Sequence, residues 1–393
     1  TFVDGTTAAS ADTIAGGEGT DRLVLNAAEA AAVGAASEFS NVTGFETIVI
    51  ADDANGQNIN MSYLGATTLE FDAAIGAHVV TAVNGATIVF DLADNNTDAR
   101  TYQISGAGTT DAITMDINGV DVGDGVQTFT GIENVTYTVS GTAISDGAIT
   151  LTPSAATQTI TITGTSGTFT TGNITTNNLD ASGYAGNFTT GTFQAAVNYT
   201  GATGNDVLTG SSSSDIINTG TGQDVVSNSL GTDQVNLGDD TVADEYEIDT
   251  VAEATHLTTI TNFKAEDVLE VDGAASVDDA EIAVSAARAA TALDDNDTII
   301  FNQTAGAAAA LTTGGTATIT DFTNLTQVEA YLDEQFTVGS DDEALIILND
   351  GTNTYVYYFH EADGATSMDA DELFHYATIE NFVLQDGDLT VTT

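Results

Sequence analysis

Short runs of apolar and β-branched residues, separated by Gly, Asn and Asp, occupy most of the chain between residues 41 and 200. Val, Ile and Thr are enriched in strands, whereas Gly, Asn and Asp mark turns, so this pattern predicts many short strands. The spacing suits a sandwich or a solenoid, and the Thr-rich runs with a single Pro favour a continuous stack of strands. The clearest runs are Glu46–Ile50, Thr87–Leu92, Ile113–Ile117, Thr136–Val139, Ala148–Leu151 and Thr157–Thr163.

Three stretches depart from this pattern. Asn26–Phe39 is rich in Ala and lacks β-branched residues apart from Val33, which predicts a short helix. Asp279–Leu293 and Leu325–Phe336 are Ala-rich or amphipathic and are predicted as helices too. Aromatic-rich strands are expected after them, at Ala344–Leu348 and Thr354–Phe359. The predicted fold class is all-β: a parallel β-solenoid or β-roll, followed by a mostly β C-terminal unit with short helices.

A nine-residue repeat runs from Gly201 to Asn236. The four units read GATGNDVLT, GSSSSDIIN, TGTGQDVVS and NSLGTDQVN. Each unit has Asp at position six and an apolar residue at position eight, and a fixed period of this kind indicates a repeat architecture. The Asp residues are Asp206, Asp215, Asp224 and Asp233, and the apolar residues are Leu208, Ile217, Val226 and Val235.

A second copy of the pattern lies near the start of the chain. Residues 16–24 read GGEGTDRLV, with Gly17, Gly19 and Asp21 at the positions that the repeat requires. Asp12 and Ile14 stand nine residues before Asp21 and Leu23. At least two units in phase therefore precede Leu25.

The repeat G-G-x-G-x-D-x-U-x has the chemistry of a calcium site. Gly permits positive φ and lets backbone carbonyls converge, while Asp supplies a hard anionic oxygen. If nine residues make half a coil, Asp206 stacks near Asp224, and Asp215 near Asp233. Two carboxylates about 4.8 Å apart repel by roughly 3–4 kcal/mol at an effective dielectric constant near 20. A Ca²⁺ ion between successive turns reverses the sign of that interaction.

We therefore expect two or three good Ca²⁺ sites in the array, since Ser or Thr replaces Gly at several positions. The acidic residues that follow it, Asp239, Asp240, Asp244, Glu245 and Glu247, are weaker candidates for additional ligands. The predicted metal-site residues are Asp206, Asp215, Asp224, Asp233, Gly204, Gly222 and Gly231 in the array, and Asp12, Asp21, Gly17 and Gly19 in the first repeats.

Charge narrows the possible partners. The chain has 393 residues, with 58 Asp plus Glu against 4 Lys plus Arg, for a net charge of −54. Nucleic acids and anionic membranes both require a basic footprint, so neither is an expected partner. No apolar stretch approaches the roughly 20 residues that span a bilayer, so membrane insertion is not expected either. With 42% hydrophobic residues the chain is expected to fold, and divalent cations would offset its repulsion.

No catalytic motif stands out. His360 and Glu361 begin like a zinc-protease helix, but Gly364 stands where the second His is required. There is no G-x-S-x-G elbow, no phosphate-binding loop and no Cys for a thiolate site. The sequence therefore predicts a protein that is not an enzyme.

The array resembles the calcium-binding repeats of RTX proteins, which leave Gram-negative bacteria by type I secretion. Thr159–Phe169, Asn178–Gly191, Ile260–Gly273 and Asp350–Gly364 are similar to the flanks of RTX-type surface-layer proteins. This resemblance implies a domain that folds outside the cell on meeting Ca²⁺ and assembles into a lattice, with an uncleaved C-terminal secretion signal. The array is shorter and more degenerate than in that family. Attachment to cell-surface polysaccharide or lipopolysaccharide is expected through a region that this chain does not contain.

Four parts are expected. Residues 1–40 form a short RTX-like repeat segment plus helix, 41–200 a Thr-rich β-solenoid, 201–245 the RTX calcium-binding β-roll, and 246–393 a β-rich assembly and secretion unit. The predicted function is a secreted, cell-surface structural protein that forms a homo-oligomeric surface layer or filament through Ca²⁺. The alternatives are a calcium-dependent adhesin or matrix protein, and the C-terminal secretion module of a secreted hydrolase.

Overall fold

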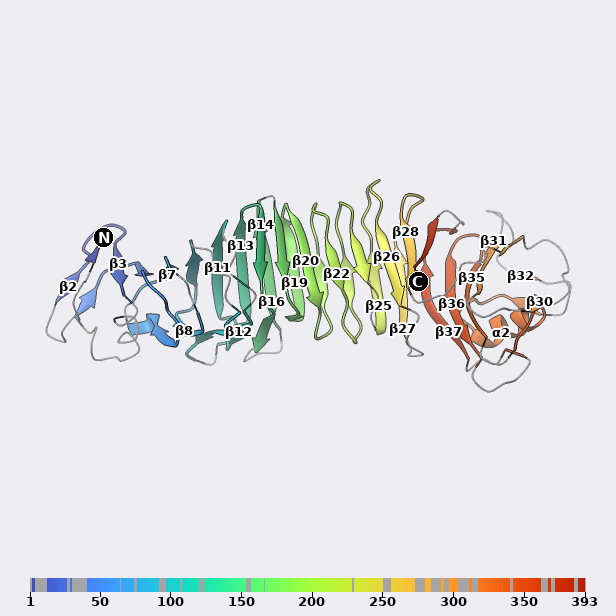
Figure 1. The fold of residues 1–393 in the computed structure, drawn as a ribbon, viewed down its shortest axis with the longest axis horizontal. Coiled ribbons are helices and arrows are strands. Elements are labelled where there is room, and N and C mark those ends of the chain that lie inside the picture. The colour runs from blue at the N-terminus through green and yellow to red at the C-terminus, as the bar shows by residue number, and fades with distance from the viewer. Residues whose placement is uncertain are drawn as a thin grey trace. The chain divides into compact units, whose positions relative to one another are not determined.

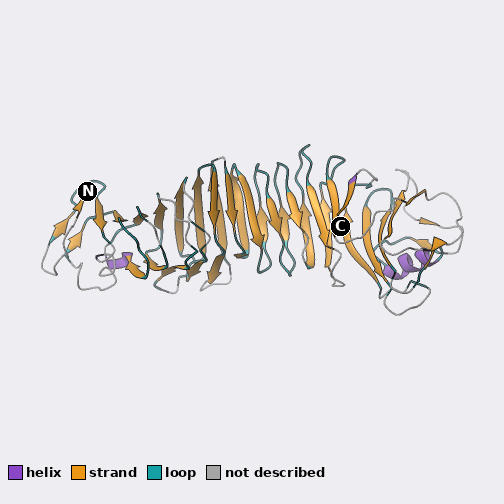
Figure 2. Ribbon diagram, viewed as in Figure 1, coloured by secondary structure: helices purple, strands orange, loops and turns teal. Residues whose placement is uncertain are grey.

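The computed structural model divides the chain into two compact units, Thr1–Leu208 and Thr209–Thr393. Strands account for most of the described residues of both units (Figure 1, Figure 2). None of the described helices has the length and apolar character that a membrane-spanning helix requires. The structure describes residues 2–3, 13–26, 29, 41–63, 65–73, 76–91, 97–106, 108–119, 123, 125–152, 157–165, 167–227, 230–249, 256–272, 280–283, 291–292, 297–302, 311–312, 317–339, 342–361, 367–368, 372–384 and 388–392.

The first unit is a parallel β-solenoid with one short 3₁₀ helix, η1 (Met61–Tyr63), among its described residues. Strand β22 (Val207–Thr209) lies at its boundary. The other strands are β1 (Phe2–Val3), β2 (Ile14–Ala15), β3 (Arg22–Leu25), β4 (Val42–Thr43), β5 (Thr47–Ile50), β6 (Gln57–Asn60), β7 (Thr68–Phe71), β8 (His78–Ala82), β9 (Ala86–Phe90), β10 (Arg100–Ile104), β11 (Ala112–Asn118), β12 (Gln127–Thr130), β13 (Asn134–Ser140), β14 (Ala143–Asp146), β15 (Ile149–Thr152), β16 (Thr159–Gly164), β17 (Thr168–Thr171), β18 (Ile174–Thr175), β19 (Asn178–Tyr184), β20 (Asn187–Thr192) and β21 (Asn198–Thr200).

The coils of this unit are built from three parallel sheets, which we number I to III. Sheet I runs β5-β7-β9-β11-β13-β16-β19-β21, sheet II runs β6-β8-β10-β12-β15-β18, and sheet III runs β14-β17-β20. From β5 to β13 the chain alternates between sheets I and II. From β13 to β19 each coil visits sheets I, III and II in turn. In many of these strands alternate residues point inward, as the pattern of β13 shows.

Aromatic rings form a column inside the first unit. Neighbouring ring centroids lie between 5.0 and 6.4 Å apart. Each ring comes from a strand of a different coil or sheet, so the column ties successive coils together. Its members are Phe71, Phe90, His78, Tyr102, Phe129, Tyr137, Phe169, Phe188 and Tyr199.

The second unit begins with parallel coils and ends in a small α+β region. Strands β23, β25 and β27 pair in one parallel sheet, and β24, β26 and β28 in another. The chain end returns to these coils, where β37 pairs with β27 and β38 with β28. The elements are β23 (Ile216–Asn218), β24 (Val225–Ser227), β25 (Gly231–Asn236), β26 (Glu245–Asp249), β27 (His256–Thr261), β28 (Val268–Asp272), β29 (Ala280–Ala283), β30 (Thr291–Ala292), β31 (Asp297–Asn302), β32 (Leu311–Thr312), β33 (Thr318–Ile319), α2 (Leu325–Asp333), β34 (Phe336–Thr337), β35 (Glu343–Asn349), β36 (Thr354–His360), β37 (Leu373–Ile379) and β38 (Leu389–Thr392).

Helix α2 packs on the α+β region through Val328, Tyr331 and Leu332, which belong to one hydrophobic cluster with strands β31 and β35 to β37. Its first turn is capped by Asn324, whose side chain accepts a hydrogen bond from the Gln327 N–H. The strands β35, β36 and β37 pair antiparallel, unlike the coils before them.

The predicted parallel β-solenoid is confirmed. The predicted strands and the helix at Leu325–Phe336 are present with small shifts of their bounds. A helix over Asp279–Leu293 was wrong: β29 and β30 are strands at its two ends, and 284–290 lies outside the described residues. Pairing of β29 with β31 overrides the helical preference of Ala. In Asn26–Phe39, residue 29 is helical, and 27–28 and 30–39 lie outside the described residues.

Candidate metal centre

The four Asp residues of the array lie just before or near the start of short strands and point inward. Asp206, Asp215 and Asp224 immediately precede β22, β23 and β24, whereas Asp233 lies within β25. All four are buried, with at most 4% of their surface exposed. The apolar residues two positions later, Leu208, Ile217, Val226 and Val235, are equally buried. The two invariant positions of the repeat are thus buried in every unit.

Asp215 and Asp233 occupy equivalent places on successive coils. The Asp215 N–H donates to Asp233 Oδ1 at 2.8 Å, eighteen residues along the chain. The Gln234 N–H donates in turn to the Asp215 carbonyl at 2.9 Å. The structure therefore brings this pair together, as an eighteen-residue coil requires.

Asp206 lies in the first unit and Asp224 in the second. Within the first unit, Asp206 accepts the Phe188 N–H at 2.9 Å and the Tyr199 hydroxyl at 2.5 Å. This contact joins Asp206 to the end of the aromatic column.

Ser211 closes the loop that precedes Asp215. Its N–H donates to Asp215 Oδ2 at 2.7 Å, and its hydroxyl donates to Asp215 Oδ1 at 2.9 Å. Gly is the usual residue at this second position of the repeat, and a hydroxyl there supplies donors that compete with a metal for the carboxylate. The replacement of Gly by Ser thus adds one hydroxyl donor to the Asp215 carboxylate.

Glycines let loops of neighbouring coils approach closely. A Cβ on Gly231 would lie 2.5 Å from the Ser213 carbonyl oxygen, and a Cβ on Gly238 would lie 1.9 Å from the Gly220 carbonyl oxygen. Gly231 and Gly238 also have φ of +129° and +94°. The carbonyl oxygens of one loop therefore point at the next loop, which is the arrangement that an oxygen-ligated ion between coils needs.

The column of aspartates continues beyond the nonapeptides. The Asp224 N–H donates to Asp244 Oδ1, and the Asp244 N–H donates to Asp267 Oδ1, both at 2.9 Å. Asp244 and Asp267 are buried, like the aspartates of the array. Sequence reasoning named Asp244 as a weak candidate and missed Asp267, because the coil lengthens from 18 to 20 and then 23 residues. The signal that remains is Asp with an apolar residue two positions later, as in Asp267 and Leu269.

Burial makes these carboxylates costly to ionise without a cation. Burial, with a smaller contribution from the neighbouring Asp215 charge, raises the pKa of Asp233 to about 7. Burial also raises the pKa of Asp244 to about 7, to which the charges of Asp224 and Asp267 contribute. A bound divalent cation would favour the ionised forms. The donors are all carboxylate or carbonyl oxygens, and this set fits Ca²⁺.

The first repeats show the same local geometry in part. Gly17 and Gly19 have φ of +101° and +119°. The Asp21 N–H donates to Glu46 Oε2 at 2.7 Å on the next coil. Asp12 lies outside the described residues.

In the array, Gly222 has φ of +139°, and a Cβ on Gly204 would meet the Gly186 carbonyl oxygen at 1.9 Å.

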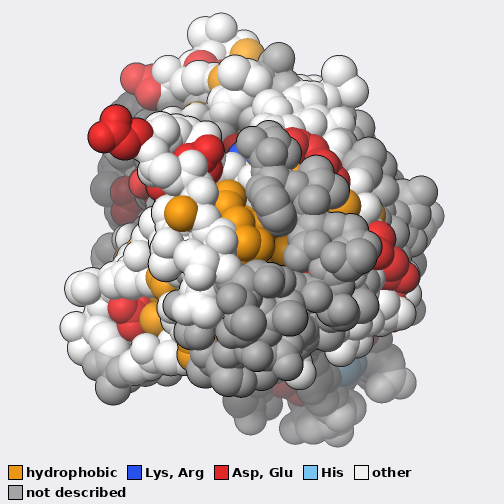
Figure 3. Space-filling view, turned by 90° about the vertical axis from the view of Figure 1, so that its left-hand side faces the viewer, with side chains coloured by type: hydrophobic (Ala, Val, Ile, Leu, Met, Phe, Trp, Pro, Cys, Tyr) orange, Lys and Arg blue, Asp and Glu red, His pale blue; other side chains and the backbone are white. Residues whose placement is uncertain are grey.

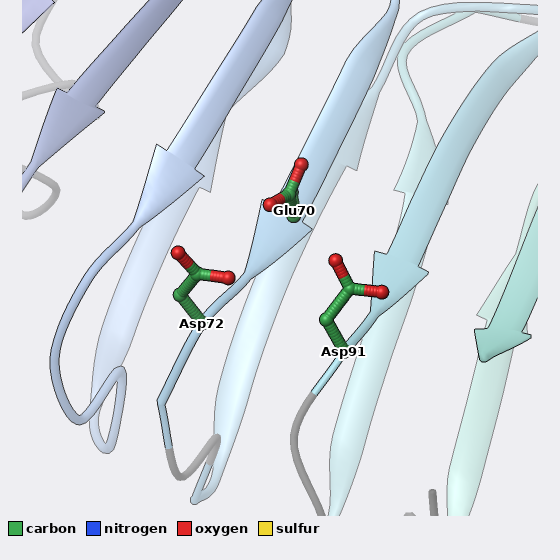
Figure 4. Close-up of side chains that lie close together, drawn as sticks. All are labelled: Glu70, Asp72 and Asp91. Atoms are coloured by element: carbon green, nitrogen blue, oxygen red, sulfur yellow. The ribbon is translucent and has the colours of Figure 1, made fainter. Parts of the chain in front are cut away.

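Among the described residues, two clusters of three acidic side chains have oxygens within 4.8 Å of one another. Glu70 lies on β7, and Asp72 and Asp91 follow β7 and β9 (Figure 4). Arg22 already forms an ion pair with Glu70, and Asp72 and Asp91 are exposed. The second group consists of Glu245, Glu247 and Glu270.

Comparison with known proteins identifies the array. The family model of the RTX calcium-binding nonapeptide repeat (4 copies) matches residues 6–27 and 200–235. Neither the curated proteins nor the solved structures yielded a match. The matched ranges contain every predicted metal-site residue, from Asp12 to Asp233. The chain therefore carries RTX calcium-binding repeats, and Ca²⁺ is the ion that they bind.

Proposed function

We propose that this is a secreted extracellular protein that folds on binding Ca²⁺ and then self-assembles into a surface layer or filament. The observation that carries the proposal is the column of buried aspartates within the RTX repeats. Metal binding and folding are coupled, because the ligands converge only in the folded coil. Where Ca²⁺ is scarce the buried carboxylates oppose folding, which suits export of an unfolded chain.

The surface of the first unit offers a place for a second copy. The outward residues of β8, β10, β12 and β15 on sheet II form what we call the uncharged face: Val79, Thr81, Thr101, Gln103, Thr128, Thr130, Thr150 and Thr152. Strands pair in register, so Thr101, Thr128 and Thr150 form one row and Thr130 and Thr152 form another.

The net negative charge of the chain favours the uncharged face as the contact between two copies. The chain carries −54, and acidic side chains are spread over the end of the molecule drawn in Figure 3. Two copies that meet through acidic faces need cations between them, whereas two copies that meet through the uncharged face do not. In a lattice, Ca²⁺ would act twice, by ordering the coils and by bridging copies at those contacts where acidic faces meet.

Two of the described histidines, His78 and His375, favour a structural role. His78 is buried against Tyr102, with Nε2 3.2 Å from the hydroxyl. His375 stacks on Tyr357 at 4.9 Å, and burial lowers its pKa to about 4. Both rings pack among aromatic side chains.

Electron microscopy of purified protein tests the proposal. With Ca²⁺ we expect ordered sheets or fibres, and with EGTA we expect them to disappear. Stable monomers under both conditions would contradict assembly and leave a calcium-dependent adhesin as the better description.

A pair of double variants separates assembly from folding. Thr128→Glu with Thr150→Glu adds charge to the uncharged face and should abolish assembly while the Ca²⁺-dependent circular dichroism stays unchanged. Thr136→Glu with Thr161→Glu makes the same change on sheet I, where the two residues also lie in register. This control should assemble like the wild type. Equal behaviour of the two double variants would show that the uncharged face is not the contact.

A further inference from the structure

Lys264 is the single lysine of a chain that holds 58 acidic residues. It lies in the loop between β27 and β28, three residues before Asp267. Its N–H donates to Asp267 Oδ2 at 2.7 Å, which anchors its backbone at the end of the aspartate column. Its side chain then extends toward the preceding coil.

The Lys264 ammonium group contacts two oxygens of that coil. Nζ donates to Asp239 Oδ1 at 2.9 Å and also to the Asp240 carbonyl oxygen. A carboxylate oxygen and a backbone carbonyl oxygen are the two kinds of ligand that Ca²⁺ takes from an RTX loop. The ammonium group thus supplies positive charge to calcium-type donors.

The loop at 237–244 has a different neighbour on each side. Toward the array, Gly238 abuts the Gly220 carbonyl, and Asp240 Oδ2 accepts the Gly222 N–H at 2.9 Å. Toward the C-terminus, the neighbouring loop has Asn262 (φ +61°), Phe263 and Lys264 in place of glycines. The glycine-lined side fits a metal ion between loops, and the other side already contains the ammonium group.

We propose that Lys264 is a built-in cation that takes the place of Ca²⁺ at the last inter-coil position, so that the calcium column ends there. The inference rests on the calcium-dependent folding proposed above. The proposed role of Lys264 accounts for the transition from coils stabilised by Ca²⁺ to the α+β region, which is stabilised by a hydrophobic cluster.

The electrostatics of the contact agree with this role. The hydrogen bond from Lys264 lowers the pKa of Asp239, and the same hydrogen bond raises the pKa of Lys264. The Asp239 side chain is 88% exposed, and an exposed ion pair contributes little to stability. Removing the ammonium group should therefore leave the protein folded in Ca²⁺.

The test counts bound Ca²⁺ per chain at saturation, by equilibrium dialysis of chelator-treated protein. Lys264→Met should bind one more Ca²⁺ than the wild type, because Asp239 and the Asp240 carbonyl become available. Lys264→Arg keeps the charge and should match the wild type. Equal stoichiometry in all three proteins would overturn the proposal for Lys264 while leaving the calcium column intact; a wild type that binds no Ca²⁺ would overturn both.

Hydrogen exchange gives a second readout. At a Ca²⁺ concentration that just saturates the wild-type sites, the β28 amides of the wild type should be protected, and those of Lys264→Met should exchange a few-fold faster, because the additional site is not yet filled. Excess Ca²⁺ should restore protection in Lys264→Met. Equal β28 protection of the two proteins at the limiting concentration would count against a metal-substituting role.

Discussion

At the scale of single residues, glycine permits positive φ, and its lack of a Cβ also lets a neighbouring backbone approach closely. Gly238→Ala should weaken Ca²⁺ binding, because its Cβ would displace the Gly220 carbonyl. Gly85 also has positive φ (+82°) but has open space around it. Gly85→Ala should therefore cost only about 1 kcal/mol of backbone strain and leave Ca²⁺ affinity unchanged. Calorimetric titration compares the two, and equal affinities would show that the Gly220 carbonyl is no ligand.

The raised pKa values predict how pH acts on Ca²⁺ binding. The pKa of Asp233 and Asp244 is about 7 in the folded coil, against about 3.9 for unfolded Asp. Without Ca²⁺ the folded state holds more protons than the unfolded state between these values, so stability falls as pH rises from about 4 through 7. Ca²⁺ binding should therefore release protons near pH 6 and weaken as pH falls from about 8 to 6.

Calorimetry in buffers of different ionisation enthalpy measures this proton release. Asp233→Asn with Asp244→Asn should reduce it, since neither amide titrates. Ca²⁺ binding with no proton exchange in the wild type would refute the assignment of these two carboxylates.

The candidate site was predictable where the repeat is regular. Period and chemistry alone located Asp206, Asp215, Asp224 and Asp233. The role of Lys264 was not predictable, because it depends on which loop lies beside it in the coil. Asp267 escaped notice for a related reason: a longer coil breaks the nine-residue spacing but keeps the contact with Asp244.

At the scale of strands, inward-facing side chains contribute more to the free energy of unfolding than outward-facing ones. Phe129 is fully buried between Tyr102 and Tyr137, at centroid distances of 5.3 and 6.4 Å. Phe129→Ala should destabilise the first unit by about 3–5 kcal/mol. Its outward neighbour Thr128 provides the control, and Thr128→Ala should change stability by about 0.5 kcal/mol or less. Denaturant unfolding in Ca²⁺ compares the two variants. Similar unfolding midpoints would show that the aromatic column does not stabilise the first unit.

The strand pattern was readable from sequence because alternation of Thr with Ile, Val or Tyr sets the two faces directly, as in β13 and β16. The change from two sheets per coil to three was not readable, since it depends on where each coil turns. Arg100 on β10 is fully buried. The neighbouring Thr, Tyr and Gln give no indication in the sequence that this arginine faces the interior. The helix predicted over the Ala-rich segment that contains β29 was wrong, because pairing with β31 outweighs the local helix propensity.

At the scale of the whole molecule, a charge of −54 raises the question of whether Ca²⁺ acts as a ligand or as a counter-ion. NaCl at about 0.1 M screens charges beyond roughly 10 Å and so relieves repulsion between exposed carboxylates. It cannot replace an ion bound to buried Asp224 and Asp244, which lie on neighbouring coils. CaCl₂ should therefore raise the unfolding temperature well above NaCl of equal ionic strength.

MgCl₂ separates valence from coordination, because Mg²⁺ demands a tighter octahedral shell and gives up its water reluctantly. Thermal unfolding should rank CaCl₂ far above MgCl₂, with NaCl lowest. In Asp224→Ala the margin of CaCl₂ over MgCl₂ should shrink, because a carboxylate of the column is lost. Asp72→Ala removes an exposed carboxylate of the first unit instead, and it should keep the full margin. If Mg²⁺ stabilised the wild type as much as Ca²⁺, screening by any divalent ion would explain the stability, and the aspartate column would not be a calcium site.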